Sequence, residues 1–521
     1  MKAMGIDIGT TTISMVMVDG ESGCLLGRST VASDSFIRGL PEVSKVQDPE
    51  KILQIVTAGI RAMVRQYGKP DCIGLTGQMH GVLYTDQEGR AVSPLYTWQD
   101  GCGNLPLTQG PAGSILPPEQ EPAGGNGRPA DAERCDAAAA ETEDSRGAAS
   151  AAEILREAGC AAASGYGLTT HFYMTKTGQV PADAAGMATI SDYIGMRLCG
   201  LKEPEIALDM AASWGCVDLE SGRFRTEVLE KLGVDTSLLP KLRRDHGVLG
   251  YTMGSPADGS ARAAAGSGMA AESGTGDIPA GIPVMLSLGD NQASFLGSVC
   301  DLSDTLLVNI GTGSQISVSA DRYYDVSGNV ELRPLVDDAF IMVGCGLCGG
   351  RAFAMLEQFF SEAAGTAKGS FYGPMIRMAE DFYEQKGREK AWQVSTTFSG
   401  SRADPDRTGS MTGITIGNFS PGAMTLGMIC GIIGELQEYS REIGAVTGAR
   451  PGHMVGSGNG IRRNVLMQRM AEEMFGMPMQ IPECEEEAAY GAALESLYGA
   501  GLVTDRQELQ SRIRYLERDR G

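Results

Sequence analysis

A carboxylate, a glycine and two hydroxyls occur together near the start of the chain, in Asp7-Ile8-Gly9-Thr10-Thr11. A tight Gly-Thr turn between two strands points several backbone N–H groups at one place, and its small side chains let a phosphate approach them. In this interpretation Asp7 holds a magnesium ion through water, while Thr10 and Thr11 donate hydrogen bonds to phosphate oxygens. A single motif of this kind is also typical of an ordinary β-hairpin.

The same pattern occurs a second time, in Asn309-Ile310-Gly311-Thr312-Gly313. In both copies an apolar run precedes the turn and a β-rich run follows it, at 13–18 and at 315–320. This internal repeat predicts two strand-turn-strand units, each at the start of one lobe. Two such turns facing each other would hold the phosphate tail of ATP from both sides.

Residues suited to bind a polyol lie in two further turns. Gln78, Met79 and His80 follow a predicted buried strand, and Trp98 and Asp100 lie in a second polar segment. A polyol needs fixed donors and acceptors beside an apolar face, because a buried hydroxyl without a partner costs about 1 to 3 kcal/mol. His80 taken alone is also compatible with a structural histidine whose hydrogen bonds are satisfied.

A third polar turn contains Gly289, Asp290 and Asn291, with the pattern of a strand end, a glycine turn and a helix start. A carboxylate presented there can accept a proton from a substrate hydroxyl, as the general base of a phosphoryl transfer does. Asp290 is equally suited to be a helix N-cap. The spacing does not separate these two interpretations.

The elements around these motifs alternate between helix and strand. Apolar periodicity predicts a helix over 49–67 before a strand at 72–75, and a helix over 426–444 before a strand at 453–456. The last stretch is predicted to be a helix over 464–474, a short strand at 479–481 and a helix over 485–498. This alternation is typical of an α/β fold.

Length and composition indicate two lobes with insertions. A chain of 521 residues, with 42% hydrophobic residues, is too long for one ordinary core. Residues 104–158 and 254–277 are rich in Ala, Gly and other small or polar residues and lack apolar periodicity. We expect both to be surface insertions, mostly disordered, with a short helix near 151–158.

The formal net charge of −22 argues against a nucleic-acid partner, which normally requires a basic surface. It also means that an anionic nucleotide must be held by backbone amides, a cation and local basic residues. The first residues run directly into a strand pattern, and no apolar run is long enough to span a membrane, so we expect a cytoplasmic protein. The Cys345 and Cys348 pair lacks a second ligand pair and is assigned to packing.

In their order along the chain these motifs, with Gly456-Ser457-Gly458-Asn459, resemble those of the FGGY carbohydrate kinases of the actin and hexokinase-like superfamily. The resemblance covers nearly all of the chain outside the two insertions. It implies two ribonuclease-H-like α/β domains around a nucleotide cleft, with a sugar-binding lobe at 1–300 and a nucleotide-binding lobe at 301–521.

The resemblance also implies roles for individual residues. Asp290 matches the catalytic base. The residues matched to ATP and magnesium binding are Asp7, Gly9, Thr10, Thr11, Gly311, Thr312, Gly313, Gly456, Gly458 and Asn459. The residues matched to the sugar pocket are Gln78, Met79, His80, Trp98, Asp100 and Asn291.

The implied reaction is ATP-dependent phosphorylation of a ketose at its terminal primary hydroxyl. The segments at 97–101, at 192–193 with 198–201, and at 211–215 are most similar to family members that act on sedoheptulose, and xylulose is the alternative. A non-catalytic sugar sensor and an ATPase scaffold are the alternatives of another class. Cys102 and Gly103 stand where many members carry Arg, which leaves the sugar contacts and hence the ketose open. A homodimer is a possible assembly.

Overall fold

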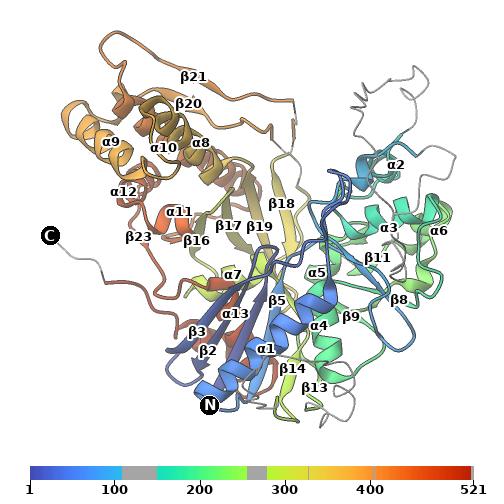
Figure 1. Cartoon of the computed structure of the whole chain (residues 1–521). Helices are drawn as coiled ribbons and strands as arrows, with labels where there is room; N and C mark the ends of the chain where they lie inside the picture. Colours follow the sequence, from blue (N-terminus) through green and yellow to red (C-terminus); the bar gives the residue numbers. More distant parts are fainter. Residues whose placement is uncertain (108–148, 255–277, 327, 402, 405, 518–521) are drawn as a thin grey trace, which may run out of the picture.

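The computed structural model describes residues 1–107, 149–254, 278–326, 328–401, 403–404 and 406–517, and within them two large sheets form the centre of the molecule (Figure 1). Most of both predicted insertions lies outside the described residues. At the end of the first one the expected short helix is confirmed as α2 (Ala151–Glu157), which begins with a capping box between Ser150 and Glu153.

The first sheet has seven strands. In spatial order they are β13 (Val248–Tyr251), β14 (Pro283–Met285), β5 (Cys72–Gly77), β1 (Lys2–Ile8), β2 (Thr12–Asp19) and β3 (Leu25–Ala32), with β15 (Leu288–Gly289) also paired to β5. The second sheet has six strands: β18 (Val330–Pro334), β19 (Phe340–Gly346), β17 (Ser314–Ala320), β16 (Thr305–Ile310), β22 (His453–Ser457) and β23 (Met479–Gln480).

The two sheets repeat one local arrangement, which confirms the repeat predicted from the sequence. Strand β1 is antiparallel to β2 and parallel to β5, and β16 is antiparallel to β17 and parallel to β22. The predicted α/β fold is confirmed by this pair of mixed sheets with helices packed on them. Each Gly-Thr turn therefore joins the two central antiparallel strands of its own sheet.

The helices follow the strands in both halves, as predicted. They are α1 (Pro49–Tyr67), α3 (Gly167–Lys176), α4 (Ile190–Cys199), α5 (Leu208–Ser213), α6 (Thr226–Lys231), α7 (Asp290–Ser298), α8 (Gly349–Ala364), α9 (Tyr372–Lys386), α10 (Pro421–Thr447), α11 (Asn459–Arg462), α12 (Val465–Phe475), α13 (Glu487–Gly499) and α14 (Arg506–Gln510). Helix α1 shows why: Asp48 caps its first N–H groups, Pro49 opens it, and Ile52, Val56 and Ile60 bury one face.

Five two-stranded sheets complete the described part of the chain. They pair β4 (Val46–Gln47) with β7 (Leu95–Tyr96), β6 (Leu83–Thr85) with β8 (Gly186–Ala188), β9 (Glu205–Ala207) with β12 (Lys241–Arg243), β10 (Val217–Asp218) with β11 (Arg223–Phe224), and β20 (Gln393–Ser395) with β21 (Ser410–Thr412). Strands β6 to β11, with α2, α3 and α6, surround the buried Trp214. Of these elements, Figure 1 shows β8, β9, β11, α2, α3 and α6 to the right of the first sheet.

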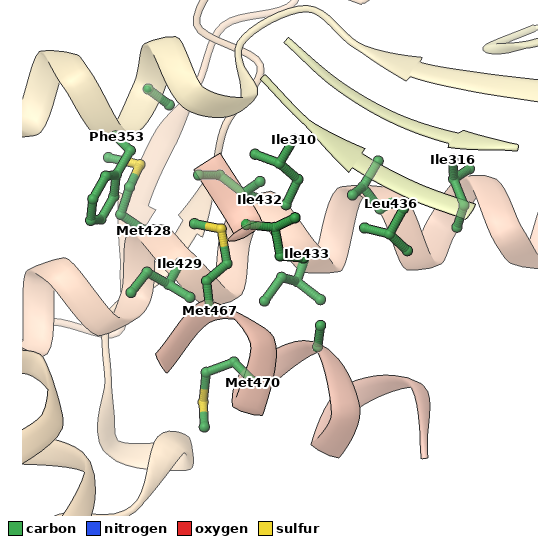
Figure 2. Close-up of a cluster of buried hydrophobic side chains, with 14 of the residues drawn as sticks. Ile310, Ile316, Phe353, Met428, Ile429, Ile432, Ile433, Leu436, Met467 and Met470 are labelled. Carbon is green, nitrogen blue, oxygen red and sulfur yellow. The ribbon is translucent and has the colours of Figure 1, made fainter. Parts of the chain in front are cut away.

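The core of the second lobe is centred on α10. Figure 2 shows apolar side chains of this helix, such as Ile432 and Ile433, between Ile310 of β16 and Met470 of α12. All four are fully buried. Helix α10 thus anchors the strand that leads into the second Gly-Thr turn.

Helix α13, near the C-terminus, packs on the first sheet, whose central strands come from the N-terminus. Figure 1 shows it in red among the blue strands. It packs against β1 and β5 so closely that a Cβ atom on Gly5 or Gly74 would lie 1.8 Å or 1.9 Å from a carbonyl oxygen of the helix. Only glycine permits this approach. The lobe boundary near residue 300 stays a prediction, and α13 packs across it. Among the described residues, no helix combines the length and apolar character needed to cross a membrane.

Candidate active site

Both Gly-Thr turns connect antiparallel strands, and each leaves one threonine side chain exposed. The first turn (residues 9–11) joins β1 to β2, and the second turn (residues 311–313) joins β16 to β17. Within the second turn the N–H of Gly311 donates to the Gly313 carbonyl at 3.0 Å. The side chains of Thr11 and Thr312 are exposed. These are the properties expected of turns that receive a phosphate.

Asp7 lies near the end of β1, opposite Ser14 of β2. Its Oδ1 atom is buried and has no hydrogen-bond partner among the described residues. Burial, with the negative charges of Asp290 and Glu486, raises the pKa of Asp7 from 3.8 to about 7. An unsatisfied buried carboxylate oxygen is costly, so this position favours a bound cation or a proton.

The metal prediction can be tested against this geometry. The described part of the chain contains no group of three or more His, Cys, Asp or Glu side chains that could hold a metal ion. A cation at Asp7 would need water and ligand oxygens as its other partners, which is how magnesium is usually bound with nucleotide phosphates. The unpartnered Oδ1 of Asp7 fits that role.

Asp290 is the first residue of α7 and follows β15 directly, as the predicted strand-to-helix turn requires. The N-cap position belongs to Gly289, whose backbone N–H donates to Asp209 at 2.7 Å. Burial raises the pKa of Asp290 from 3.8 to about 6, and the positive charge of Arg333 opposes that rise. A base with this pKa is largely ionised near neutral pH and still basic enough to take a proton.

Arg333 reaches this site from β18 of the other sheet. Its Nη1 donates to Oδ1 of Asn291 at 3.2 Å, and its Nε and Nη2 donate to Glu331 at 3.1 Å and 2.7 Å. No sequence signal marks Arg333, because it lies in an ordinary strand with alternating burial and no motif around it. The predicted sugar contact Asn291 therefore has its carbonyl oxygen engaged by the second lobe.

Three predicted residues meet through Thr10. The Nε1 of Trp98 donates to Thr10 Oγ1 at 3.0 Å, and Thr10 Oγ1 donates to Gln78 Oε1 at 3.3 Å. The Nε2 of Gln78 donates to Gln47 at 2.8 Å. Trp98 is 49% exposed although it is a large aromatic residue. The first turn and two predicted sugar-pocket residues thus form one hydrogen-bonded group with an open aromatic face.

His80 is held in a strained and specific orientation after β5. Its φ of 73° is in the left-handed region that non-glycine residues rarely adopt. Its N–H donates to Ser213 Oγ at 2.9 Å, its Nδ1 lies 2.6 Å from the Ser213 carbonyl, and its ring stacks on Tyr166 at 4.5 Å. Because a carbonyl only accepts, Nδ1 carries the proton. Neighbouring Met79 is buried and its side chain lies beside Gly289 of the turn that leads into Asp290.

Asp100 is buried and uses its carboxylate on the backbone. Its Oδ2 accepts from the N–H of Lys45 at 2.9 Å, and its Oδ1 accepts from the N–H of Cys102 at 3.0 Å. The structure thus gives Asp100 a part in shaping the turn after Trp98. A direct sugar contact by Asp100 stays a prediction.

The predicted adenine-side residues follow β22. Gly456 lies in the strand, Gly458 follows it with a φ of 82°, and the exposed Asn459 begins α11. A Cβ atom on Gly458 would lie 2.8 Å from the carbonyl oxygen of Ile310, just before the second turn. Gly350 at the start of α8, which the sequence analysis missed, approaches Gly311 even more closely. Close backbone packing therefore builds this side of the site.

Comparison with known proteins agrees with this geometry. A model described as the N-terminal domain of the FGGY family of carbohydrate kinases matches residues 2–103, and one described as the C-terminal domain matches 306–500. The chain is 27% identical to a sedoheptulokinase of Mus musculus and 28% identical to one of Homo sapiens, over 95% of this chain and 97% of each relative.

Solved structures share the fold. A xylulose kinase from Rhodospirillum rubrum has a TM-score of 0.75 at 18% identity, covering 99% of this chain and 93% of that one. A Plasmodium falciparum glycerol kinase, solved with ADP, has a TM-score of 0.71 at 14% identity, covering 98% and 92%.

Proposed function

The chain belongs to the FGGY family of carbohydrate kinases, and from this membership we propose that it phosphorylates the terminal primary hydroxyl of a ketose with ATP. Sedoheptulose is the substrate that we favour, with sedoheptulose 7-phosphate as the product. The similarity to two sedoheptulokinases over nearly the whole chain supports this choice. Xylulose is the second candidate, because it presents the same terminal hydroxyl on a shorter chain.

One observation carries the proposal: the candidate base is built next to the candidate sugar residues. Strand β15 pairs with β5 so that Gly289 lies opposite Gly77, and Asp290 and Gln78 follow directly. A sugar held at Gln78, Met79 and His80 would therefore lie beside the Asp290 carboxylate. Asp7 pairs with Thr76 of β5 and Thr10 donates to Gln78, so the first Gly-Thr turn lies beside the same end of β5 and could bring a phosphate to this place.

The reaction follows from these positions. Asp290 accepts the proton of the sugar hydroxyl while the hydroxyl oxygen forms a bond to the γ-phosphorus of ATP. The bond between that phosphorus and the oxygen that bridges it to the β-phosphate then breaks, and ADP leaves. The N–H groups and hydroxyls of the two Gly-Thr turns bind the phosphates from the two lobes. A magnesium ion bound at Asp7, through water, would neutralise phosphate charge. Gly456, Gly458 and Asn459 would hold the adenosine.

The two lobes would close on the cleft so that water does not compete with the sugar. We place the sugar-binding lobe at 1–300 and the nucleotide-binding lobe at 301–521. The cytoplasmic location and a homodimer remain proposals that rest on the sequence.

The direct test is ADP release measured with sedoheptulose, xylulose, ribulose and glycerol at matched concentrations. We expect the highest kcat/KM for sedoheptulose, and ATP turnover without sugar at least about 100-fold slower, because closure excludes water. A higher kcat/KM for xylulose would make this a xylulokinase. Sugar binding measured by calorimetry without any ADP release would identify a sensor instead of a kinase.

The role of Asp290 is tested by Asp290→Asn, which keeps the shape and removes the proton acceptor. General base catalysis contributes about 10² to 10⁴ in rate, so kcat should fall at least about 100-fold while ATP binding and thermal stability persist. If Asp290 only stabilised the helix start, Asn would replace it well and kcat would stay near normal. Near-normal turnover would therefore reject the mechanism.

A further inference from the structure

Asp209 is a buried carboxylate directly behind the turn that carries the candidate base. It lies in the first turn of α5 and is 1% exposed. Its Oδ2 accepts from the N–H of Gly289 at 2.7 Å, the residue immediately before Asp290. Gly289 is the N-cap of α7 and has no side chain of its own to organise this peptide. An acceptor from a distant part of the chain performs that task.

His246 fixes the other oxygen of the same carboxylate. Its Nε2 lies 3.0 Å from Asp209 Oδ1, and its side chain is only 9% exposed. With both oxygens bonded, Asp209 has little freedom to rotate. Asp192 is another buried carboxylate near this pair, and it accepts hydrogen bonds from the hydroxyls of Ser287 and Thr189. Both buried carboxylates behind the turn are therefore held by hydrogen bonds from the protein.

The other end of α5 holds the sugar side of the site. Ser213, its last residue, accepts from the backbone N–H of His80 through Oγ, and its carbonyl accepts from His80 Nδ1. Helix α5 has only six residues, so it is a short and stiff connection. One end contacts the turn before Asp290, and the other end contacts His80.

We propose that Asp209 is a positioning residue that, through α5, sets the spacing between the base Asp290 and the sugar-side His80, with His246 locking its carboxylate. The inference rests on the roles proposed above for Asp290 and His80. Its physical basis is that transfer requires the sugar oxygen and the base to be in contact, and a misplacement of about 1 Å can cost about 100-fold in rate. Asp209 itself touches neither substrate.

The test compares Asp209→Ala with Asp209→Asn. The alanine variant removes the acceptor, and we expect kcat to fall about 10- to 100-fold, with a KM for ATP within about two-fold of the unchanged protein. The asparagine variant keeps a carbonyl oxygen for the Gly289 N–H, and we expect it to retain kcat within about five-fold. Rescue by Asn would show that hydrogen-bond geometry is needed and that negative charge is not.

Glu357→Ala provides the matched control. Glu357 is also buried and also accepts backbone N–H groups, those of Gly369 and Phe371, but it lies in α8 of the other lobe. Removing it should lower the melting temperature about as much as Asp209→Ala while kcat changes less than about three-fold. Equal losses of kcat in the two alanine variants would mean that Asp209 only stabilises the fold, and the proposal would fail.

Two further outcomes keep this inference separate from the proposed function. If Asp290→Asn is inactive and the folded Asp209→Ala variant has a normal kcat, the assignment of Asp290 as the base is supported and the positioning role of Asp209 is rejected. If Asp209→Ala does not fold, His246→Leu tests the same link by removing the donor that locks Asp209. We then expect kcat to fall about three- to ten-fold at a nearly constant KM for ATP, and an unchanged kcat overturns the proposal.

Discussion

The first and second Gly-Thr turns have the same backbone arrangement but different chemistry. In the first, the strand position two residues before the glycine is Asp7, whose buried Oδ1 has no hydrogen-bond partner among the described residues. In the second, the equivalent position is Asn309, whose Nδ2 donates to Ser457 Oγ at 2.8 Å. One copy has an unsatisfied carboxylate oxygen, and the other has a satisfied amide.

The hydroxyls of the two turns differ in the opposite sense. Thr10 of the first turn is bonded to Trp98 and Gln78, whereas Thr312 of the second turn is exposed. The second turn is instead surrounded by glycine contacts, from Gly350 and Gly458. The duplicated arrangement thus carries side-chain hydrogen bonds at the turn of one lobe and close glycine backbone packing at the turn of the other.

The largest effect on kcat should come from removing the carboxylate at the first turn. Asp7→Asn removes the carboxylate that we assign to phosphate and magnesium chemistry, and kcat should fall about 100-fold. Asn309→Ala loses one hydrogen bond, worth about 1 kcal/mol, and should keep kcat within about three-fold. Steady-state kinetics of both variants measure the asymmetry. Equal losses would mean that the two turns contribute alike.

A smaller effect should follow from adding a methyl group at Gly458, next to the second turn. Gly458→Ala forces a side chain onto a φ of 82° and against the carbonyl of Ile310, so the KM for ATP should rise about ten-fold with little change in the KM for sugar. The matched control is Gly448→Ala, which has a φ of 75° and no atom within 4 Å of the added carbon. If the control raises the KM for ATP equally, backbone strain alone explains the result.

The hydroxyls allow a finer comparison. Thr10→Val breaks the link between Trp98 and Gln78, and we expect the KM for sugar to rise about three- to ten-fold. Thr312→Val should leave the KM for sugar unchanged, because we assign the second turn to the nucleotide. Initial rates measured against sugar concentration at saturating ATP give the KM for sugar of both variants. A sugar effect in Thr312→Val would place the second turn in the sugar pocket.

The mildest change is a shift in pH dependence. Asp290 must be ionised to act as a base, so kcat/KM should fall as the pH drops below about 6, the value to which its pKa is raised. The positive charge of Arg333 lowers the pKa of Asp290, so the Arg333→Gln substitution should raise this pKa. The acidic limb of the pH profile of kcat/KM should then move to higher pH. Arg244→Gln, at an exposed ion pair with Asp338, is the control and should not move the limb. If the acidic limb does not move in Arg333→Gln, Arg333 does not influence the pKa of the base.

The elements and motifs with a local cause could be predicted from the sequence. Helix α1 was predicted with its observed bounds, because Asp48 and Pro49 signal its start and an apolar stripe runs along it. Both Gly-Thr turns and the strand-to-helix turn at Asp290 were predicted for the same reason, since their residue types demand a particular backbone. The repeat itself indicated two related lobes.

Only the tertiary structure decided which side chains support these motifs. Arg333 reaches Asn291 from 42 residues away, and Asp209 reaches Gly289 from 80 residues away. Helix α13 packs on strands that lie at the opposite end of the chain. Such contacts depend on how distant strands come together and leave no periodic pattern in the sequence. The sequence alone determined where the turns and helices form. Three-dimensional packing determined which partners orient Asp290, because hydrogen bonds between distant segments exist only after the sheets assemble.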